Sequence, residues 1–280
     1  MLTPMDKIEG LVARAPDMRA LAARATLEQL LRQHAPLVVA YSGGVDSACL
    51  LAVAHRVLGD RVLGVIADSP SLPRQALADA LAVAEGFGAK VEVIRTTEVE
   101  DPRYAANPLN RCYFCKAELF QQLDVLARAR GFAAIAYGEN ADDPAHLRPG
   151  SQAAAEFAIL APLKQAGLTK ADVRAISEEL GLPTADAPAQ PCLSSRIPHG
   201  TPVTRDALAL VERGEALVRS LGFRVFRVRY VDGTPPAARV QIAPEEMDRL
   251  GGLRAAIDEG LRAAGFGGVE IDPQGYRPAV

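Results

Sequence analysis

The segment from residue 37 to residue 58 constrains the fold more than any other part of the chain. The apolar run LVVAY at residues 37–41 is typical of a buried strand, and a helix is predicted from about Asp46 to Leu58. Between them lies the turn SGGVDS, residues 42–47. Glycines let a backbone come close to an anion, and the free amides of a first helical turn point at it. The segment therefore predicts an α/β fold with a phosphate-binding loop.

Further strands and helices alternate along the N-terminal two thirds of the chain. Such an alternation predicts a parallel sheet that helices cover on both faces. Ligands of these sheets bind outside the carboxyl ends of the strands. Polar residues follow three of the predicted strands, at residues 42–47, at Asp68 and Ser69, and at residues 138–143. The predicted strands are residues 37–41, 62–67, 91–94 and 133–137, and the predicted helices are residues 17–34, 46–58, 72–87, 113–130 and 169–180.

The pattern changes near residue 183. Five prolines lie between Pro183 and Pro202, so no helix can run through this segment, and we expect an extended hinge. After it, the chain predicts a small α+β unit. We therefore expect a domain of residues 1–200 and a domain of residues 201–280. The elements of the second are helices at 204–221 and 244–264 and strands at 224–230, 238–243 and 269–272.

Composition excludes several classes of protein. The chain has 280 residues, of which 49% are hydrophobic and 23% charged, an ordinary globular mixture. Its 31 basic and 34 acidic residues give a net charge of −3, which disfavours a general nucleic-acid binder. It contains no run of about 18 apolar residues that would span a membrane. We expect a soluble, cytoplasmic protein without nucleic-acid or membrane partners.

The SGGVDS turn differs from the phosphate loop of Walker type, because it has no lysine and lacks the GxxxxGK[ST] spacing. Its hydroxyl groups add donors for a phosphate, and Asp46 is suited to hold a Mg²⁺ ion. A plain strand–turn–helix junction is the alternative interpretation. The sequence and its position after the first strand resemble the PP-loop ATP pyrophosphatase superfamily, whose fold is adenine-nucleotide α-hydrolase-like.

That resemblance implies that ATP is cleaved between its α and β phosphates, after which a nucleophile displaces AMP from the adenylated substrate. The resemblance also assigns residues. Asp68 and Ser69 would lie near the adenosine. The pyrophosphate and its Mg²⁺ would be held by Ser42, Gly43, Gly44, Asp46 and Ser47.

Three of the four cysteines form a second candidate site. Cys112 and Cys115 make a CxxC pair, and Cys192 follows in the proline-rich segment. The pair alone is compatible with a redox dithiol or with a zinc site completed by His199. Three thiolates also leave one iron of a 4Fe–4S cluster open, which could carry sulfide. Cys49, on the helix after the phosphate loop, is expected to be a small buried hydrophobe.

The segments around these cysteines resemble the LarE family, and the resemblance spans about residues 17–272. It rests on DSPSLP at 68–73, GENADD at 138–143 and PCLSSRIPHG at 191–200. It implies an ATP-dependent sulfur transferase of nickel-pincer nucleotide synthesis, whose substrate is pyridinium-3,5-biscarboxylic acid mononucleotide. One variant of the family sacrifices the sulfur of a single cysteine, here Cys192. The other holds a 4Fe–4S cluster on three cysteines, which is the pattern of Cys112, Cys115 and Cys192, and needs a sulfide donor.

The strand at residues 224–230 places Arg227 and Arg229 on one face, where two guanidinium groups suit a substrate phosphate. Ser195 and Arg196 are further candidates for binding the substrate. Glu215 is expected on a solvated helix face. After the fourth strand, the candidates for a second Mg²⁺ ligand or a substrate contact are Glu139, Asp142 and Asp143, and Lys164 is a candidate for contacting a phosphate.

Three other classes of protein are also compatible with parts of the sequence. A PP-loop amide ligase would need a source of ammonia and would leave the three cysteines without a purpose. A tRNA thiolase would need a wide basic surface, which the slightly acidic composition does not favour. A nucleotide sensor with a structural zinc is the non-catalytic alternative. By analogy with the family, we expect a homo-oligomer, namely a hexamer.

Overall fold

The computed structural model describes residues 18–144 and 149–276. Its N-terminal part is built on the predicted parallel sheet. The strands are β1 (Leu37–Ala40), β2 (Val62–Asp68), β3 (Val91–Arg95) and β4 (Ala134–Tyr137), in the order β3-β2-β1-β4. The chain moves outward from β1 to β3 and then returns to the other side of β1. This reversal opens a ligand-binding position at the carboxyl ends of β1 and β4.

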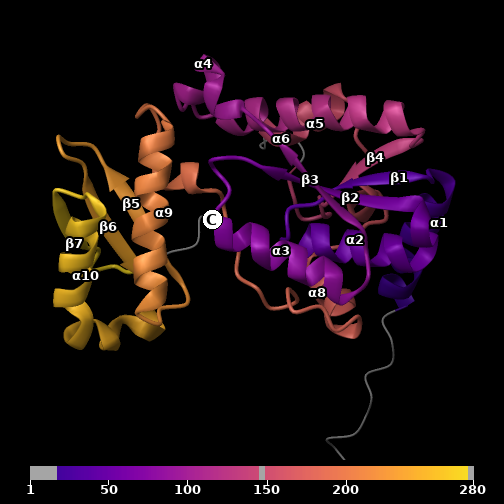
Figure 1. Cartoon of the computed structure of the whole chain (residues 1–280). Coiled ribbons are helices and arrows are strands. Elements are labelled where there is room, and N and C mark those ends of the chain that lie inside the picture. The colour runs from indigo at the N-terminus through magenta and orange to yellow at the C-terminus, as the bar shows by residue number, and fades with distance from the viewer. Residues whose placement is uncertain (1–17, 145–148, 277–280) are drawn as a thin grey trace, which may run out of the picture.

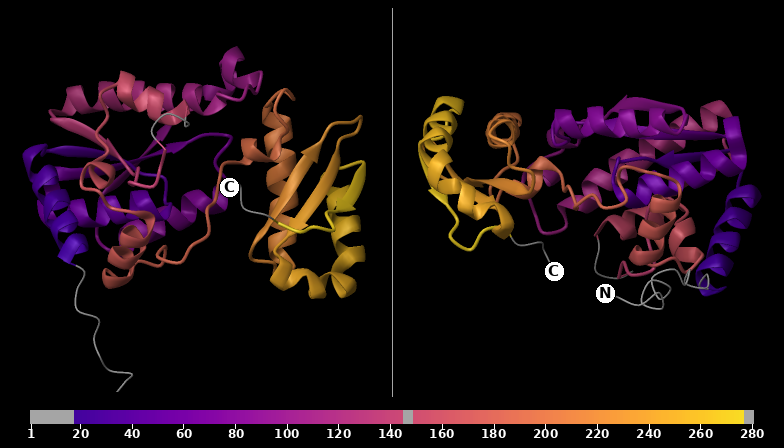
Figure 2. Two further views of the ribbon diagram at one scale, coloured as in Figure 1. Left: turned by 180° about the vertical axis from the view of Figure 1, so that it is seen from behind. Right: turned by 90° about the horizontal axis from the view of Figure 1, so that it is seen from below.

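Helices cover both faces of this sheet, as Figures 1 and 2 show. On one face α2 is central and packs against α1, α3 and α8. The opposite face carries α5 and α6. The bounds are α1 Met18–Gln33, α2 Val45–Leu58, α3 Arg74–Gly86, α5 Arg111–Arg130, α6 Pro149–Glu156 and α8 Lys170–Glu179.

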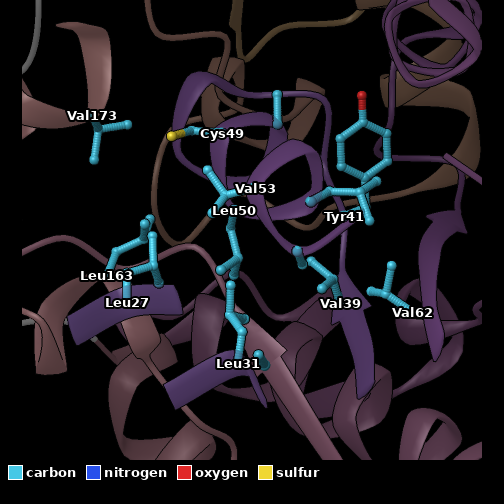
Figure 3. Packing of buried hydrophobic residues seen from close by; sticks show 14 of the residues in the cluster. Leu27, Leu31, Val39, Tyr41, Cys49, Leu50, Val53, Val62, Leu163 and Val173 are labelled. Carbon is cyan, nitrogen blue, oxygen red and sulfur yellow. The ribbon is translucent and has the colours of Figure 1, made fainter. Parts of the chain in front are cut away.

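The side chains of β1 alternate between two hydrophobic cores. Leu37, Val39 and Tyr41 face the core built on α1 and α2, which Figure 3 shows from close by. Val38 and Ala40 face the core under α5. All four residues of β1 are buried, which explains why this strand reads as an unbroken apolar run. Cys49 lies in the first core with 0% exposure, as predicted for a buried hydrophobe.

A separate, smaller sheet follows near the C-terminus and has the order β5-β6-β7. Its first two strands are antiparallel and its last two are parallel. The helices α9 and α10 pack on one face and form a core with Phe226, Val228 and Val240. The bounds are α9 Arg205–Ser220, β5 Phe226–Val231, β6 Ala237–Ile242, α10 Leu250–Ala264 and β7 Gly268–Ile271.

The proline-rich segment between the two sheets has little regular structure, as predicted. Within it, Leu193–Arg196 form the short 3-10 helix η4. Leu193 and Ile197 join a small core with residues of α4 (Pro102–Ala105) and α9. Figure 1 shows α4, the start of α5 and the upper end of α9 close together. The segment that carries Cys192 is thus packed between elements from both parts of the chain.

The predicted strands and long helices are all present, with ends shifted by up to two residues except in the last helix. There α10 begins at Leu250, because Pro244–Arg249 form the 3-10 helix η5. The predicted helix at 72–87 begins at Arg74, because Pro73 is its extended N-cap residue. The prediction missed the short helices α4, α6 and α7 (Pro162–Gln165). These are too short to show a helical periodicity. In the described ranges, no helix is both long and apolar enough to cross a membrane.

Candidate functional site

The SGGVDS turn forms a tight loop between β1 and α2. The backbone N–H of Ser42 donates to Oγ of Ser47 at 3.1 Å, and the two hydroxyl oxygens lie 3.0 Å apart. Gly43 has a φ of +74°, and a Cβ there would lie 2.5 Å from Cβ of Ala80. Gly44 is the extended N-cap residue of α2. The loop therefore needs glycine at position 43, and it leaves the first-turn amides of α2 at the edge of the sheet.

Asp46 stands in the first turn of α2 and has two partners from distant segments. Lys170 Nζ donates to its Oδ2 at 2.6 Å, and Asn140 Nδ2 donates to its Oδ1 at 3.2 Å. Lys170 is the first residue of α8, after the N-cap Thr169. The backbone N–H of Lys170 in turn donates to Asp142. The first turns of α2 and α8 therefore meet at one carboxylate.

The loop after β4 touches the phosphate-loop helix directly. A Cβ on Gly138 would lie 2.6 Å from the backbone nitrogen of Ser47 and 2.8 Å from the carbonyl carbon of Asp46. Only glycine allows this approach without a shift of the backbone. The predicted meeting of the polar ends of β1 and β4 is therefore observed, although nothing in the sequence indicated the contact at Gly138.

Asp68 and Ser69, at the end of β2, line an open groove of about 560 Å³ beside α9. Asp68 accepts a hydrogen bond from Arg74 Nη1, and Ser69 is buried against Ser71. The backbone N–H of Arg74 donates to Glu212 of α9 at 2.6 Å. The proposed adenosine position thus borders the C-terminal part of the protein.

The three predicted site cysteines lie in one region, while Cys49 is separate. Cys112 and Cys115 stand in the first turns of α5, and Cys192 directly precedes η4. All four cysteines are free thiols. Cys115 packs against the small core that also contains Leu193. Tyr104 Oη and Ser194 Oγ lie 2.6 Å apart and link α4, which precedes α5, to η4.

The thiols act on one another electrostatically. Burial raises the pKa of Cys115, and the charges of Glu98, Cys192 and Cys112 act in the same direction. Desolvation of its thiol also raises the pKa of Cys112, together with Cys192, whereas Arg111 and Lys116 lower it. In residues 18–144 and 149–276, no three His, Cys, Asp or Glu side chains surround the position of a single metal ion. The thiols of Cys112, Cys115 and Cys192, with or without His199, are therefore not grouped around a single metal position in this part of the chain.

Arg196 and Glu215 form a buried ion pair. The guanidinium Nε lies 2.8 Å from Oε1 of Glu215, and the side chains are only 3% and 7% exposed. The prediction that Glu215 lies on a solvated face is therefore wrong. The helix α9 turns this residue inward, where it also accepts the backbone N–H of Val228. Nη1 of Arg196 donates to the carbonyl groups of Pro191 and Cys192, so the pair holds the cysteine loop.

Arg227 and Arg229 lie on one face of β5, as predicted, and both contact the same loop. Arg227 donates to the carbonyl of Ala189 at 2.8 Å, and Arg229 donates to the carbonyl of Ser195 at 2.6 Å. Burial lowers the pKa of both guanidinium groups, and the charge of Arg196 lowers it further. Arg227 also stacks on Tyr276, a partner that the sequence did not suggest. Three cations therefore surround the loop that carries Cys192.

The remaining candidates after β4 form a network of their own. Glu139 is buried and accepts hydrogen bonds from Tyr137, Ser151 and Lys164. Lys164 also donates to the carbonyl of Asp143 at 3.0 Å. The side chain of Asp143 accepts the backbone N–H of Asn140. This network supports the loop that delivers Asn140 to Asp46.

Comparison with known proteins agrees with this geometry. The NAD synthase family model matches residues 23–191, which contain the sheet, the SGGVDS loop and Lys170. The chain belongs to this family of PP-loop ATP pyrophosphatases. ATP binding follows from that membership. The matched range ends one residue before Cys192, so the third cysteine and the C-terminal sheet lie outside what the family shares.

Three relatives extend over more of the chain. An uncharacterized protein of Synechocystis sp. is 41% identical over 90% of this chain and 93% of its own length. The pyridinium-3,5-bisthiocarboxylic acid mononucleotide synthase of Lactiplantibacillus plantarum is 33% identical over 91% of each chain. An uncharacterized protein of Methanocaldococcus jannaschii is 26% identical over 69% of this chain and 73% of its own. The second relative and this chain therefore share both parts of the fold.

Proposed function

We propose that the protein is an ATP-dependent sulfur transferase. It adenylates a carboxylate of pyridinium-3,5-biscarboxylic acid mononucleotide and converts it to a thiocarboxylate. The observation that carries this proposal is the loop of Cys192, which three arginines hold and in which the N–H of Leu193 donates to the carbonyl of Ser71, close to the end of β2. The printed name of the Lactiplantibacillus relative agrees with such a reaction.

At the nucleotide end, Asp46 would hold Mg²⁺ on the phosphates, and the first-turn amides of α2 would bind the pyrophosphate. Lys170 would also bind a phosphate group, because its ammonium group already lies at Asp46. An oxygen of the substrate carboxylate attacks the α phosphorus of ATP. The bond between this phosphorus and the bridging oxygen breaks, and pyrophosphate leaves with its electron pair. The product of this step is an acyl adenylate.

At the substrate end, Arg227 and Arg229 would bind the phosphate of the mononucleotide. Among the described residues, neither has a carboxylate within ion-pair distance, while Arg196 is neutralised by Glu215. A phosphate would supply the missing negative charge and accept bidentate hydrogen bonds. Arg196 and Ser195 act through the loop instead, because Arg196 bonds to Oγ of Ser195 and to two loop carbonyls.

Cys112, Cys115 and Cys192 would hold a 4Fe–4S cluster. Two features of the donor set support this: three free thiols from two segments influence one another electrostatically, and a cluster with one open iron requires no fourth ligand. When bound, the cluster supplies sulfide as a nucleophile. Sulfide at the carbonyl carbon of the adenylate would displace AMP, with cleavage of the bond between that carbon and the AMP oxygen. Arg227 and Arg229 would hold the phosphate of the substrate during this exchange.

The alternative sulfur source is Cys192 itself. Its thiolate would attack the adenylate and release AMP. Loss of the Cα proton and cleavage of the Cβ–S bond would then leave the sulfur on the substrate and dehydroalanine in the chain. Cys192 is half-buried and lies in a loop directly before η4, a position that suits either route.

The sulfur source can be decided by purifying the protein without oxygen and analysing iron, acid-labile sulfide and zinc together. We expect about four irons per chain, held by thiolates. Substitution of Cys112 by serine should remove the iron and leave ATP binding intact. Zinc in a one-to-one ratio would contradict the cluster. Metal-free protein in which Cys192 loses the mass of H₂S after one turnover would establish the sacrificial route.

We further propose that residues 1–200 and 201–280 are separate domains and that the protein assembles as a homohexamer. The second domain would then contribute the phosphate-binding arginines and contacts between copies. Light scattering of the purified chain tests this assembly directly, and a monomer would contradict it.

A further inference from the structure

Asn107 occupies an unusual position in the turn between α4 and α5. It is completely buried, with 0% exposure, and its φ is +55°. Non-glycine residues rarely adopt this left-handed conformation, and asparagine tolerates it better than most. The residue lies near the start of α5, where Cys112 and Cys115 stand. No part of the nucleotide or phosphate chemistry described above uses it.

The side chain of Asn107 bonds to both segments that carry the cysteines. Its Nδ2 donates to the carbonyl of Pro198 at 2.7 Å and to that of Thr201 at 2.9 Å, shortly after Cys192 in the chain. Its Oδ1 accepts from Nη1 of Arg111, the residue directly before Cys112. The amide group therefore satisfies both donor hydrogens on one side and its acceptor on the other.

Backbone hydrogen bonds also join the turn at Asn107 to the segment that follows Cys192. The carbonyl of Asn107 accepts the N–H of Gly200 at 3.1 Å, and the carbonyl of Ala105 accepts the N–H of Val203 at 2.8 Å. Arg111 is buried, and its guanidinium lies 6.0 Å from the centre of the Tyr104 ring. This arrangement is a clasp, here defined as Asn107, Arg111 and residues 197–201.

We infer that Asn107 is a positioning residue that fixes the distance between the CxxC pair and Cys192. The inference rests on the proposed function only in that the three cysteines are taken to act together. Aspartate at this position would keep the size and the bond to Arg111 but would lose both donors. Glycine would keep the backbone conformation but would lose every side-chain bond.

The test measures the distance between thiols and needs neither ATP nor substrate. Cys112 is replaced by serine, so that Cys115 and Cys192 are the two remaining thiols of the region. The full-length, metal-free protein is treated without oxygen with dibromobimane, which fluoresces after it joins two thiols. Mass spectrometry of the joined peptides identifies the pair. Asn107→Gly and Asn107→Asp should each slow this cross-link by about tenfold, the factor expected from losing one or two net hydrogen bonds.

A matched control separates positioning from general loss of stability. Leu261→Ala weakens the core of the C-terminal sheet, to which no residue of the clasp belongs. Each protein is measured at the same number of degrees below its own melting temperature. The Leu261→Ala variant should cross-link at the parent rate. Equal rates for parent and both Asn107 variants would overturn the inference, and so would a parent that forms no Cys115–Cys192 cross-link. Because the readout is independent of turnover, failure of the sulfur-transfer proposal would leave this result interpretable.

Discussion

Nζ of Lys170 lies 2.6 Å from Oδ2 of Asp46, although 124 residues separate the two in sequence. The contact joins the first turn of α8 to the first turn of α2. The ammonium group neutralises the carboxylate. If Asp46 holds Mg²⁺ as proposed, we expect the same group to contact a phosphate oxygen of ATP.

Lys170→Ala should lower ATP-dependent pyrophosphate release by about ten- to a hundredfold, because a hydrogen bond to a charged group contributes about 1.5–3 kcal/mol. Lys170→Arg should retain more activity than Lys170→Ala, since the positive charge remains. Steady-state pyrophosphate release measures both. Lys90→Ala is the control, because that lysine pairs with Asp60 at the exposed surface. Equal rates of pyrophosphate release for Lys170→Ala and Lys90→Ala would show that Lys170 has no role in the nucleotide site.

Asp46→Asn preserves the size of the side chain and removes its charge. We expect pyrophosphate release to fall by about two orders of magnitude, the loss typical when a charge-stabilising group is removed from an active site. Excess Mg²⁺ should restore part of the rate. The cysteine region should be unchanged, so thiol cross-linking serves as the control for folding. An Asp46→Asn protein with a parental rate and Mg²⁺ dependence would mean that another group holds the ion.

The buried pair of Arg196 and Glu215 predicts a characteristic pattern of stability. Glu215→Leu leaves the guanidinium of Arg196 buried without its partner and should cost about 3–5 kcal/mol. The double variant with Arg196→Met should recover most of the stability but no sulfur transfer, because the loop of Cys192 loses its support. Urea denaturation compares the three proteins. A double variant no more stable than Glu215→Leu would argue against a buried, mutually dependent pair.

Glu139 predicts a dependence of stability on pH. Burial raises the pKa of this carboxyl, but hydrogen bonds from Tyr137, Ser151 and Lys164 outweigh it and hold the pKa below the ordinary 4.5. The ionised form is therefore favoured in the folded state. Its contribution is complete above the unfolded pKa and is lost as the pH falls through the folded pKa.

The measurement compares the melting temperatures of the parent and Glu139→Gln from neutral pH down to the lowest pH at which both proteins still fold. The parent should be more stable at neutral pH, and the difference should shrink as the pH falls below about 4.5. A difference that stays constant over this range would contradict the assignment of the shift to Glu139.

The sequence was sufficient to predict the sheet because its signals are local. The apolar run of β1, the glycines at 43 and 44 and the cap of α8 at Thr169 each specify their own structure. The prediction of Cys112, Cys115 and Cys192 as one site needed a family resemblance, since spacing alone leaves several chemistries open. In the structure the three thiols influence one another electrostatically, and their grouping as one site stays a prediction.

Contacts between distant segments could not be predicted from the sequence. Lys170 looks like any lysine at a helix start, and Gly138 like any loop glycine, until β4 is placed beside β1. Glu215 was misassigned because a single carboxylate on an amphipathic helix is usually solvated. Its burial depends on Arg196, which comes from the proline-rich segment that has no periodic pattern.

The most direct test of sulfur transfer is one anaerobic reaction that contains the protein, Mg²⁺, ATP, sulfide and pyridinium-3,5-biscarboxylic acid mononucleotide. Pyrophosphate and the mass of the pyridinium product are measured together. The proposed function predicts that pyrophosphate appears only with the mononucleotide and that a product oxygen is replaced by sulfur. Pyrophosphate release with an unchanged pyridinium compound, or with an amide in its place, would contradict sulfur transfer as the activity of this protein.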